Sequence, residues 1–155
     1  MRKAKHKVKA VEGAETKLKI RHVIVCDDVR QEISGKEILI GVYNDILIFP
    51  GFPALMESLF FRIAATCPIK LAGEYRFALV GPNDKKVFEV SNSLAPVPSQ
   101  DENRIFNLAF RGVPFVEEGI YQIHFGVNGP ARKIWQLMAR LPHGDIEKQR
   151  LRPNI

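Results

Sequence analysis

The sequence contains few of the residues from which small proteins build disulfide frameworks or metal centres. Two cysteines, Cys26 and Cys67, occur among 155 residues. They are too few for a disulfide scaffold, and their spacing matches no zinc or redox motif. We interpret both as small buried apolar residues. The spacing of metal ligands is also missing among the histidines, which are His6, His22, His124 and His143. The sequence therefore predicts neither a bound metal nor a cofactor.

Long apolar runs are missing as well. No stretch approaches the roughly 20 apolar residues that a membrane helix needs. The basic N-terminus is not followed by the apolar run of an export signal. These features predict a soluble, cytoplasmic protein without a membrane partner. The length fits one domain, which buries roughly 68–70% of the surface that its unfolded chain exposes, so an apolar core needs no disulfide.

The formal net charge of +6 is concentrated at one end of the chain. Residues 1–17 hold six basic and two acidic side chains, a net charge of +4, whereas residues 18–142 hold fourteen and thirteen, which leaves +1. Residues 143–155 add three basic and two acidic side chains. We therefore divide the chain into a basic polar arm (1–17), a folded domain (18–142) and a polar tail (143–155).

The basic arm has two interpretations. It could contact nucleic-acid phosphates, and the candidate contacts are Arg2, Lys3, Lys5, Lys7 and Lys9. No aromatic residue lies between the lysines to stack on bases, so such binding would be nonspecific. The alternative is a flexible arm that aids solubility.

From Leu18 onward apolar residues recur with a period of two, which is the pattern of half-buried strands. The pattern in LKIRHVIVC predicts one core-facing side, formed by Leu18, Ile20, His22, Ile24 and Cys26. The polar stretch 27–36 is then predicted to be a long turn that leads to a strand over 37–43. Residues 44–49 (NDILIF) would continue this strand after a break.

Further strands follow, separated by turn signals that contain glycine, proline and asparagine. The alternation predicts strands over 57–67, 75–80, 86–92, 104–110, 119–127 and 133–141. Residues 54–60 (ALMESLF) allow one helical turn as an alternative. Several strands without a long amphipathic helix between them indicate an all-β protein with an antiparallel sandwich or barrel.

A short motif favours the sandwich. EEGIYQI places Glu117 four residues before Tyr121 and Gly119 two residues before it. This spacing resembles the tyrosine corner of immunoglobulin-like domains, in which the tyrosine hydroxyl binds the backbone a few residues upstream. The inter-sheet cysteine expected two positions after the tyrosine is Ile123 here. The prediction is therefore an immunoglobulin-like antiparallel β-sandwich without an inter-sheet disulfide.

Polar residues are concentrated in the stretch 24–43 (IVCDDVRQEISGKEILIGVY), and the candidates for a site are Cys26, Asp27, Asp28, Glu32 and Glu37. Successive strand residues point to opposite faces, so two adjacent aspartates do not aim at one metal ion without a bulge. The central glycine of a calcium loop is also missing. We interpret the stretch as a structural turn between two strands.

A catalytic cysteine would need a histidine to activate it. His22 lies on the same strand as Cys26, roughly 13 Å along it, and His124 could approach from another strand. Gly35-Lys36 lacks the rest of a phosphate-binding loop and precedes a strand rather than a helix. The sequence predicts no catalytic residue, and the protein is predicted not to be an enzyme.

Two further groups of residues are candidate binding sites. A modest basic patch is predicted on the last strand, formed by Arg132, Lys133 and Arg140. Such a patch is more typical of a charged strand that discourages aggregation than of a phosphate site. Small molecules or carbohydrates could stack on Trp135, Tyr43 and Tyr121. The apolar neighbours of these aromatic residues favour a place in the core instead.

The string CDDVRQEISGKEILIGVYNDI (residues 26–46) resembles the N-terminal hairpin of an uncharacterised bacterial family of small proteins, known as a domain of unknown function. The later G-x-Y strand and its closing hairpin fit the same family, so the resemblance covers residues 18–141. It implies a β-sandwich, and it supplies no catalytic residues to carry over.

The function expected from the sequence is that of a noncatalytic sandwich that binds another protein or assembles with itself. The nearly balanced charge of the body and the irregular loops favour this expectation. The first alternative is nonspecific association with nucleic acid through the basic arm. The second is binding of a small molecule or carbohydrate.

Overall fold

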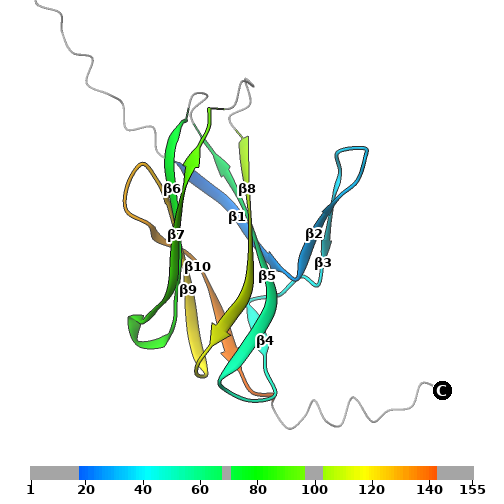
Figure 1. Cartoon of the computed structure of the whole chain (residues 1–155), viewed down its shortest axis with the longest axis vertical. Helices are drawn as coiled ribbons and strands as arrows, with labels where there is room; N and C mark the ends of the chain where they lie inside the picture. Colours follow the sequence, from blue (N-terminus) through cyan, green and yellow to red (C-terminus); the bar gives the residue numbers. More distant parts are fainter. Residues whose placement is uncertain (1–17, 68–70, 97–102, 143–155) are drawn as a thin grey trace, which may run out of the picture.

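A computed structural model describes residues 18–67, 71–96 and 103–142 (Figure 1). The basic arm with its five candidate phosphate contacts and the polar tail lie outside the described residues. The described chain contains a short 3-10 turn, η1 (Pro82–Asp84), and ten strands. The strands are β1 (Lys19–Cys26), β2 (Asp28–Gln31), β3 (Glu37–Ile40), β4 (Ile46–Ile48), β5 (Ala54–Thr66), β6 (Gly73–Val80), β7 (Lys86–Leu94), β8 (Asn103–Phe115), β9 (Gly119–Val127) and β10 (Arg132–Arg140).

Two sheets form the body of the protein. The smaller sheet has the order β1-β5-β8, and the larger sheet has the order β4-β10-β9-β6-β7. All pairs in them are antiparallel except β4 with β10, which is parallel. Among the described residues, the strands β2 and β3 pair only with each other, and they project sideways from the body (Figure 1). The predicted all-β sandwich is confirmed, and both cysteines are buried, free thiols rather than an inter-sheet disulfide.

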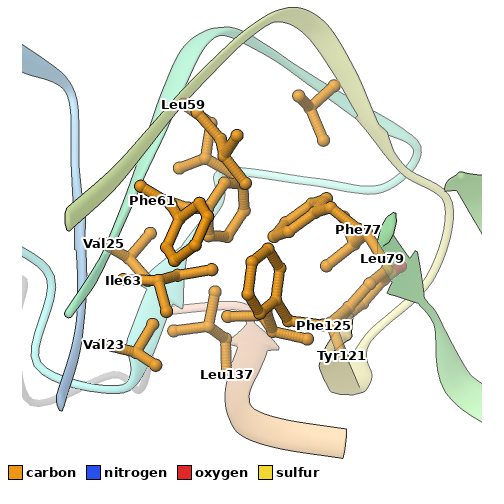
Figure 2. Packing of buried hydrophobic residues seen from close by; sticks show 14 of the residues in the cluster. Val23, Val25, Leu59, Phe61, Ile63, Phe77, Leu79, Tyr121, Phe125 and Leu137 are labelled. Atoms are coloured by element: carbon orange, nitrogen blue, oxygen red, sulfur yellow. The ribbon is translucent and has the colours of Figure 1, made fainter. Parts of the chain in front are cut away.

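The core lies between the two sheets and is built from alternate residues of their strands (Figure 2). Phe61 of β5 meets Phe77 of β6 with ring centroids 4.8 Å apart, and Phe106 of β8 meets Phe125 of β9 at the same separation. No polar or charged residue is buried among the described residues. Burial of apolar surface is therefore the main force that holds the sheets together.

The first strand differs from its predicted phase. A register shift between Ile20 and His22 turns the rest of β1 over, as a β-bulge does. Val23 and Val25 consequently enter the core, whereas His22 is exposed. Cys26 is fully buried, but it lies on the outer side of the smaller sheet, beside β2. The prediction that His22, Ile24 and Cys26 face the core is therefore wrong.

Three local predictions also need correction. Residues 54–60, for which a helical turn was an alternative, belong to the long strand β5. The polar stretch 27–36 contains the strand β2, so the turn is limited to the residues between Gln31 and Glu37. Residues 46–48 do not continue β3 but join the larger sheet beside β10. Pairing with strands distant in sequence decides β4 and β5, and periodicity does not report such pairing.

The tyrosine at position 121 fixes the corner between β8 and β9. Its hydroxyl donates to the carbonyl oxygen of Glu117 at 3.0 Å and accepts from the amide of Val116 at 3.1 Å, while the side chain is 1% exposed. Gly119 has a φ of 149°, and a Cβ there would lie 2.7 Å from Pro82. Both sheets are therefore joined at a corner that requires this tyrosine and this glycine.

We expect Tyr121→Phe to lower the free energy of unfolding by about 1–2 kcal/mol, because the buried hydroxyl that bonds to three backbone groups is lost. Urea denaturation followed by fluorescence measures the change. Tyr75→Phe is the matched control, since the Tyr75 hydroxyl makes no hydrogen bond within the described residues, and we expect a change below about 0.5 kcal/mol. An equal loss in both variants would show that the corner hydrogen bonds do not stabilise the fold.

Candidate functional site

The stretch 24–43 forms the end of β1 and the β2–β3 hairpin. The hairpin closes through hydrogen bonds from the amide of Glu32 to the carbonyl of Lys36 at 2.8 Å and from the amide of Gly35 to the carbonyl of Glu32 at 2.9 Å. Gly35 has a φ of 82°, a conformation that glycine adopts without strain. Gly35-Lys36 thus serves the turn rather than a phosphate-binding loop.

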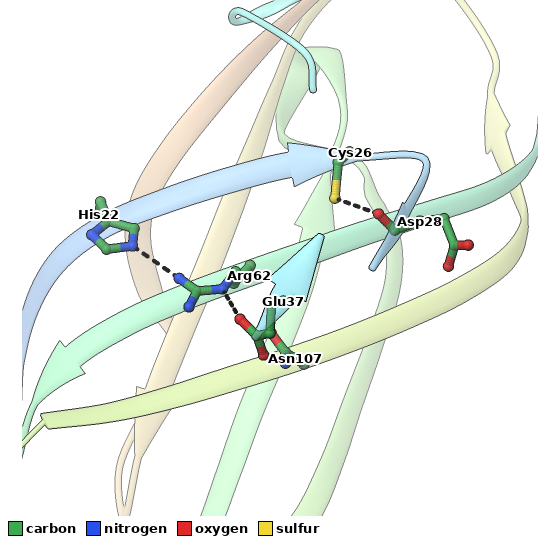
Figure 3. Close-up of polar contacts among 6 residues, drawn as sticks. All are labelled: His22, Cys26, Asp28, Glu37, Arg62 and Asn107. Carbon is green, nitrogen blue, oxygen red and sulfur yellow. Dashed lines mark hydrogen bonds and ion pairs between the residues drawn. The ribbon is translucent and has the colours of Figure 1, made fainter. Parts of the chain in front are cut away.

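A polar cluster attaches the hairpin to the outer side of the smaller sheet (Figure 3). Glu37 of β3 accepts from Arg62 Nε at 2.7 Å and from Asn107 Nδ2 at 2.9 Å. Arg62 also donates through Nη1 to His22 Nε2 at 3.2 Å. The hydrogen bond from Arg62, and then that from Asn107, hold the pKa of the Glu37 carboxyl below its ordinary value. The cluster therefore links three strands of the body to the hairpin.

A second set of contacts fixes the base of the hairpin. The Tyr43 hydroxyl donates to Asp27 Oδ1, and Ser58 Oγ donates to the Asp27 carbonyl at 3.0 Å. Gly41 has a φ of 66° and lies directly against the Asp27 side chain, so no larger residue fits there. Burial, followed by the contact with Asp27, raises the pKa of Tyr43. Asp27 is thus engaged in holding the chain where it leaves β1.

The cysteine and histidine considered as a catalytic pair do not come together in the structure. Burial raises the pKa of the Cys26 thiol, and its Sγ donates to the carbonyl of Asp28 at 3.5 Å. A protonated thiol is a poor nucleophile. His124 points outward from β9 of the larger sheet, where it contacts Gln122 at 3.3 Å. Cys26 and His124 therefore lie on opposite outer sides of the sandwich.

The acidic residues of the same stretch also separate. Asp28 binds Arg30 at 3.2 Å, and Glu32 accepts from Ser34 at 3.0 Å, both at exposed positions. Within residues 18–67, 71–96 and 103–142, no group of three or more histidine, cysteine, aspartate or glutamate side chains could hold a metal ion. No helix in this part of the chain is long and apolar enough to cross a membrane.

A different surface gathers exposed apolar side chains. Ile46 of β4 pairs with Met138 of β10, and Met138 pairs with Ile120 of β9, so the three lie in one row across the larger sheet. Together with Trp135, these three residues line a shallow pocket of about 570 Å³. These four residues, which we call the Trp135 surface, are 41%, 37%, 43% and 37% exposed in that order.

The position of Trp135 is held by Asp45. The indole Nε1 donates to Asp45 Oδ1 at 3.0 Å, and the Met138 amide donates to the Asp45 carbonyl at 2.7 Å. Asp45 itself has a φ of 62°, an uncommon conformation for a residue with a side chain. The ring is therefore fixed although more than a third of its surface is accessible.

Sequence reasoning missed this surface. The prediction that Trp135 belongs to the core is wrong, because β4 pairs only with residues 138–140 of β10 and leaves the strand edge open at Trp135. The exposure of Ile46, Ile120 and Met138 was not predicted, because the type of an apolar residue does not show whether its side chain is buried. The available signal was that Met138 and Ile120 fall out of phase with the buried Leu137 and Tyr121.

Among the other aromatic and basic candidates, Lys133 lines the pocket of Trp135, and the rest lie apart from it. Tyr121 is buried in the core and Tyr43 contacts Asp27, so neither joins Trp135 in its pocket. On β10 the predicted basic residues are Arg132, Lys133 and Arg140. Lys133 donates to Gln136 at 2.7 Å, and none of the three forms an ion pair within the described residues.

A comparison with known protein families finds a match over most of the chain. The model of a family described as a family of unknown function (DUF6941) matches residues 21–140. This range includes the hairpin, the polar cluster and the Trp135 surface. The resemblance to a family of unknown function is thereby confirmed, while its bacterial origin stays a prediction. No curated protein matches the chain.

We expect Glu37→Gln to lower the free energy of unfolding by about 1–2 kcal/mol at pH 7, since a charged hydrogen bond to Arg62 is lost. The pKa of Glu37 is lowered in the folded protein, so this stabilisation is present above the ordinary carboxyl pKa of 4.5. It is lost as pH falls through the lower folded value. Urea denaturation at pH 7 and at lower pH measures both quantities.

The matched control for this prediction is Glu57→Gln on β5, because Glu57 is exposed and forms no ion pair within the described residues. We expect the control to change the free energy of unfolding by less than about 0.5 kcal/mol. A difference between Glu37→Gln and the unmodified protein that stays constant as pH falls would contradict the assigned role of the Glu37 carboxylate.

Proposed function

The chain belongs to this family of unknown function, and we propose that it is a noncatalytic β-sandwich that binds another protein or a second copy of itself. The observation that carries the proposal is the Trp135 surface. Four apolar residues are accessible together there: Ile46, Ile120, Trp135 and Met138. They are not part of the buried apolar core between the sheets. Contiguous exposed apolar side chains of this kind mark interaction sites.

The composition of the Trp135 surface supports a protein partner. Tryptophan and methionine are enriched in protein interfaces, and tryptophan is among the residues that contribute most to binding free energy. The hydrogen bond from Trp135 to Asp45 fixes the ring before binding. A side chain that is already fixed loses little conformational entropy when a partner covers it. The surface therefore combines apolar area with low mobility.

The polar residues support a role without catalysis. Glu37 and Arg62 are engaged with each other, and Asp27 is engaged with Tyr43 and Ser58. These contacts attach the hairpin to the body, which gives the polar residues of the stretch 24–43 a structural purpose.

We further propose that the protein acts in the cytoplasm, because free cysteines such as Cys26 and Cys67 are typical of reducing compartments.

We expect Met138→Glu to weaken association by about tenfold or more, because it places a charge at the centre of an apolar interface. Light scattering after size exclusion measures self-association. Quantitative mass spectrometry of proteins that copurify from the source cells measures binding to other partners. Leu55→Glu is the matched control, since Leu55 is an exposed apolar residue on a strand of the smaller sheet.

The same experiment can contradict the proposal in two ways. Equal copurification and equal mass for Met138→Glu and the unmodified protein would exclude the Trp135 surface as the binding site. A strict monomer without any reproducible partner would exclude the binding function itself. Circular dichroism of both variants verifies that the exposed substitutions leave the sandwich folded.

A second candidate function rests on the charge of the basic arm, which holds six basic and two acidic residues in positions 1–17. We expect weak binding to duplex DNA that falls steeply with salt, with a slope of log K against log salt of roughly −4 to −5 for five phosphate contacts. Replacement of Arg2, Lys3, Lys5, Lys7 and Lys9 by glutamine should abolish it. Glutamine at Arg132, Lys133 and Arg140 is the control, and unchanged binding by the arm variant would exclude this function.

A further inference from the structure

β8 forms an edge of the smaller sheet with one side of its backbone unpaired. β5 pairs with β8 along its whole length, from Asn103 to Phe115. Among the described residues no strand pairs with the other side of β8. Amide and carbonyl groups along that side are therefore available to another extended chain, which is the usual way in which a free edge recruits a strand.

The larger sheet extends beyond this edge and is not fully covered. Phe77 of β6 is completely buried, but its partner on the next strand, Val90 of β7, is 36% exposed. Asn92 of β7 is exposed next to the half-buried Tyr75. The rings of Phe88 and Phe110, with centroids 4.6 Å apart, close the core at this side. The inner face of β7 beyond Phe110 is therefore open at the place where a further strand beside β8 would lie.

The two halves of β8 differ in the features that discourage strand pairing. The C-terminal half carries Arg111, then Gly112 with a φ of 65°, then Pro114, all of which disfavour a regular edge. The N-terminal half, from Asn103 to Phe110, has one charged residue, Arg104. Its guanidinium binds the carbonyls of Leu71 and Ala95 at 2.9 and 2.6 Å within its own chain. The accessible part of the edge is therefore residues 103–110.

The charges along β8 indicate the chemistry of the partner. The strand contains Arg104 and Arg111 and no acidic residue. The neighbouring edge of β7 differs, since Lys86 is paired there with Glu89. A strand that adds beside β8 would place alternate side chains over Val90 and Phe110 and the others toward solvent near Arg111. Apolar residues suit the first set, and acidic residues suit the second.

We propose that the edge of β8 between Asn103 and Phe110 binds an extended segment of a partner protein in which apolar and acidic residues alternate. The proposal rests on the proposed function as a protein-binding sandwich, but it concerns a separate surface from the Trp135 surface. Backbone hydrogen bonds to β8 supply affinity, burial of Val90 selects apolar residues, and the exposed Arg111 at the end of this stretch selects acidic ones.

The test uses a synthetic nine-residue peptide of alternating valine and glutamate, with the valine and lysine peptide as its charge-reversed control. Hydrogen exchange of the full chain, followed by mass spectrometry, reports protection of amides 103–110. We expect protection with the acidic peptide and affinity for it at least about threefold above that for the basic one, as expected from one weak ion pair with Arg111. Equal binding of the two peptides, or protection confined to other strands, would overturn the proposal.

Variants separate this proposal from the function of the Trp135 surface. Val90→Glu and Ala109→Glu should both abolish protection by the acidic peptide, because each places a negative charge beside the proposed binding edge. Both side chains are exposed, so we expect both variants to fold. Met138→Glu should leave the protection unchanged, so loss of the Trp135 function alone does not affect this result. Persistence of protection in both edge variants would overturn the proposal. Protection of β8 without peptide in a dimer seen by light scattering would also overturn it, because the occupant would then be a second copy.

Discussion

Phe61 and Phe77 pack against each other across the sandwich, as part of the contact between two apolar sheet faces that holds the domain together. No disulfide links the described residues, and no polar residue is buried among them, so the apolar faces alone bring the sheets together. The sheets have three and five strands. Because the smaller cannot cover the larger, Val90 on the inner face of β7 stays accessible beside the edge of β8, where one of the proposed interactions is placed.

The β2–β3 hairpin is stabilised in a different way. Two strands alone are marginally stable in water. Here Glu37 is held by Arg62 and Asn107 on one side, and Asp27 is held by Tyr43 at the base. The concentration of polar residues in the stretch 24–43 therefore reflects the attachment of a projecting hairpin to an apolar body. These structural contacts account for the polar composition of the stretch.

Much of the fold follows from sequence, and the candidate site does not. The alternation of apolar and polar residues located the strands around Phe61, Phe77 and Tyr121, because successive side chains of a strand point to opposite faces of the sheet. The same alternation wrongly placed His22 on the core-facing side of β1. A bulge of one residue moves all later side chains of the strand to the opposite face, and the amino-acid composition does not reveal such a bulge. The alternation also assigned Trp135 to the core, since exposure depends on how far β4 extends along β10. Met138 and Ile120 become recognisable as a surface only when their strands are paired.

An all-β sandwich with free cysteines, a corner at Tyr121 and membership of a family of unknown function follow from the sequence alone, because these features depend on local periodicity and on short motifs. The positions of the polar hairpin residues, and the accessibility of the apolar ones, were set by the tertiary structure. It also decided that the edge of β8 stays unpaired within the described chain. The physical reason is that burial is a property of the neighbours that a strand acquires, and in this protein those neighbours come from distant parts of the chain.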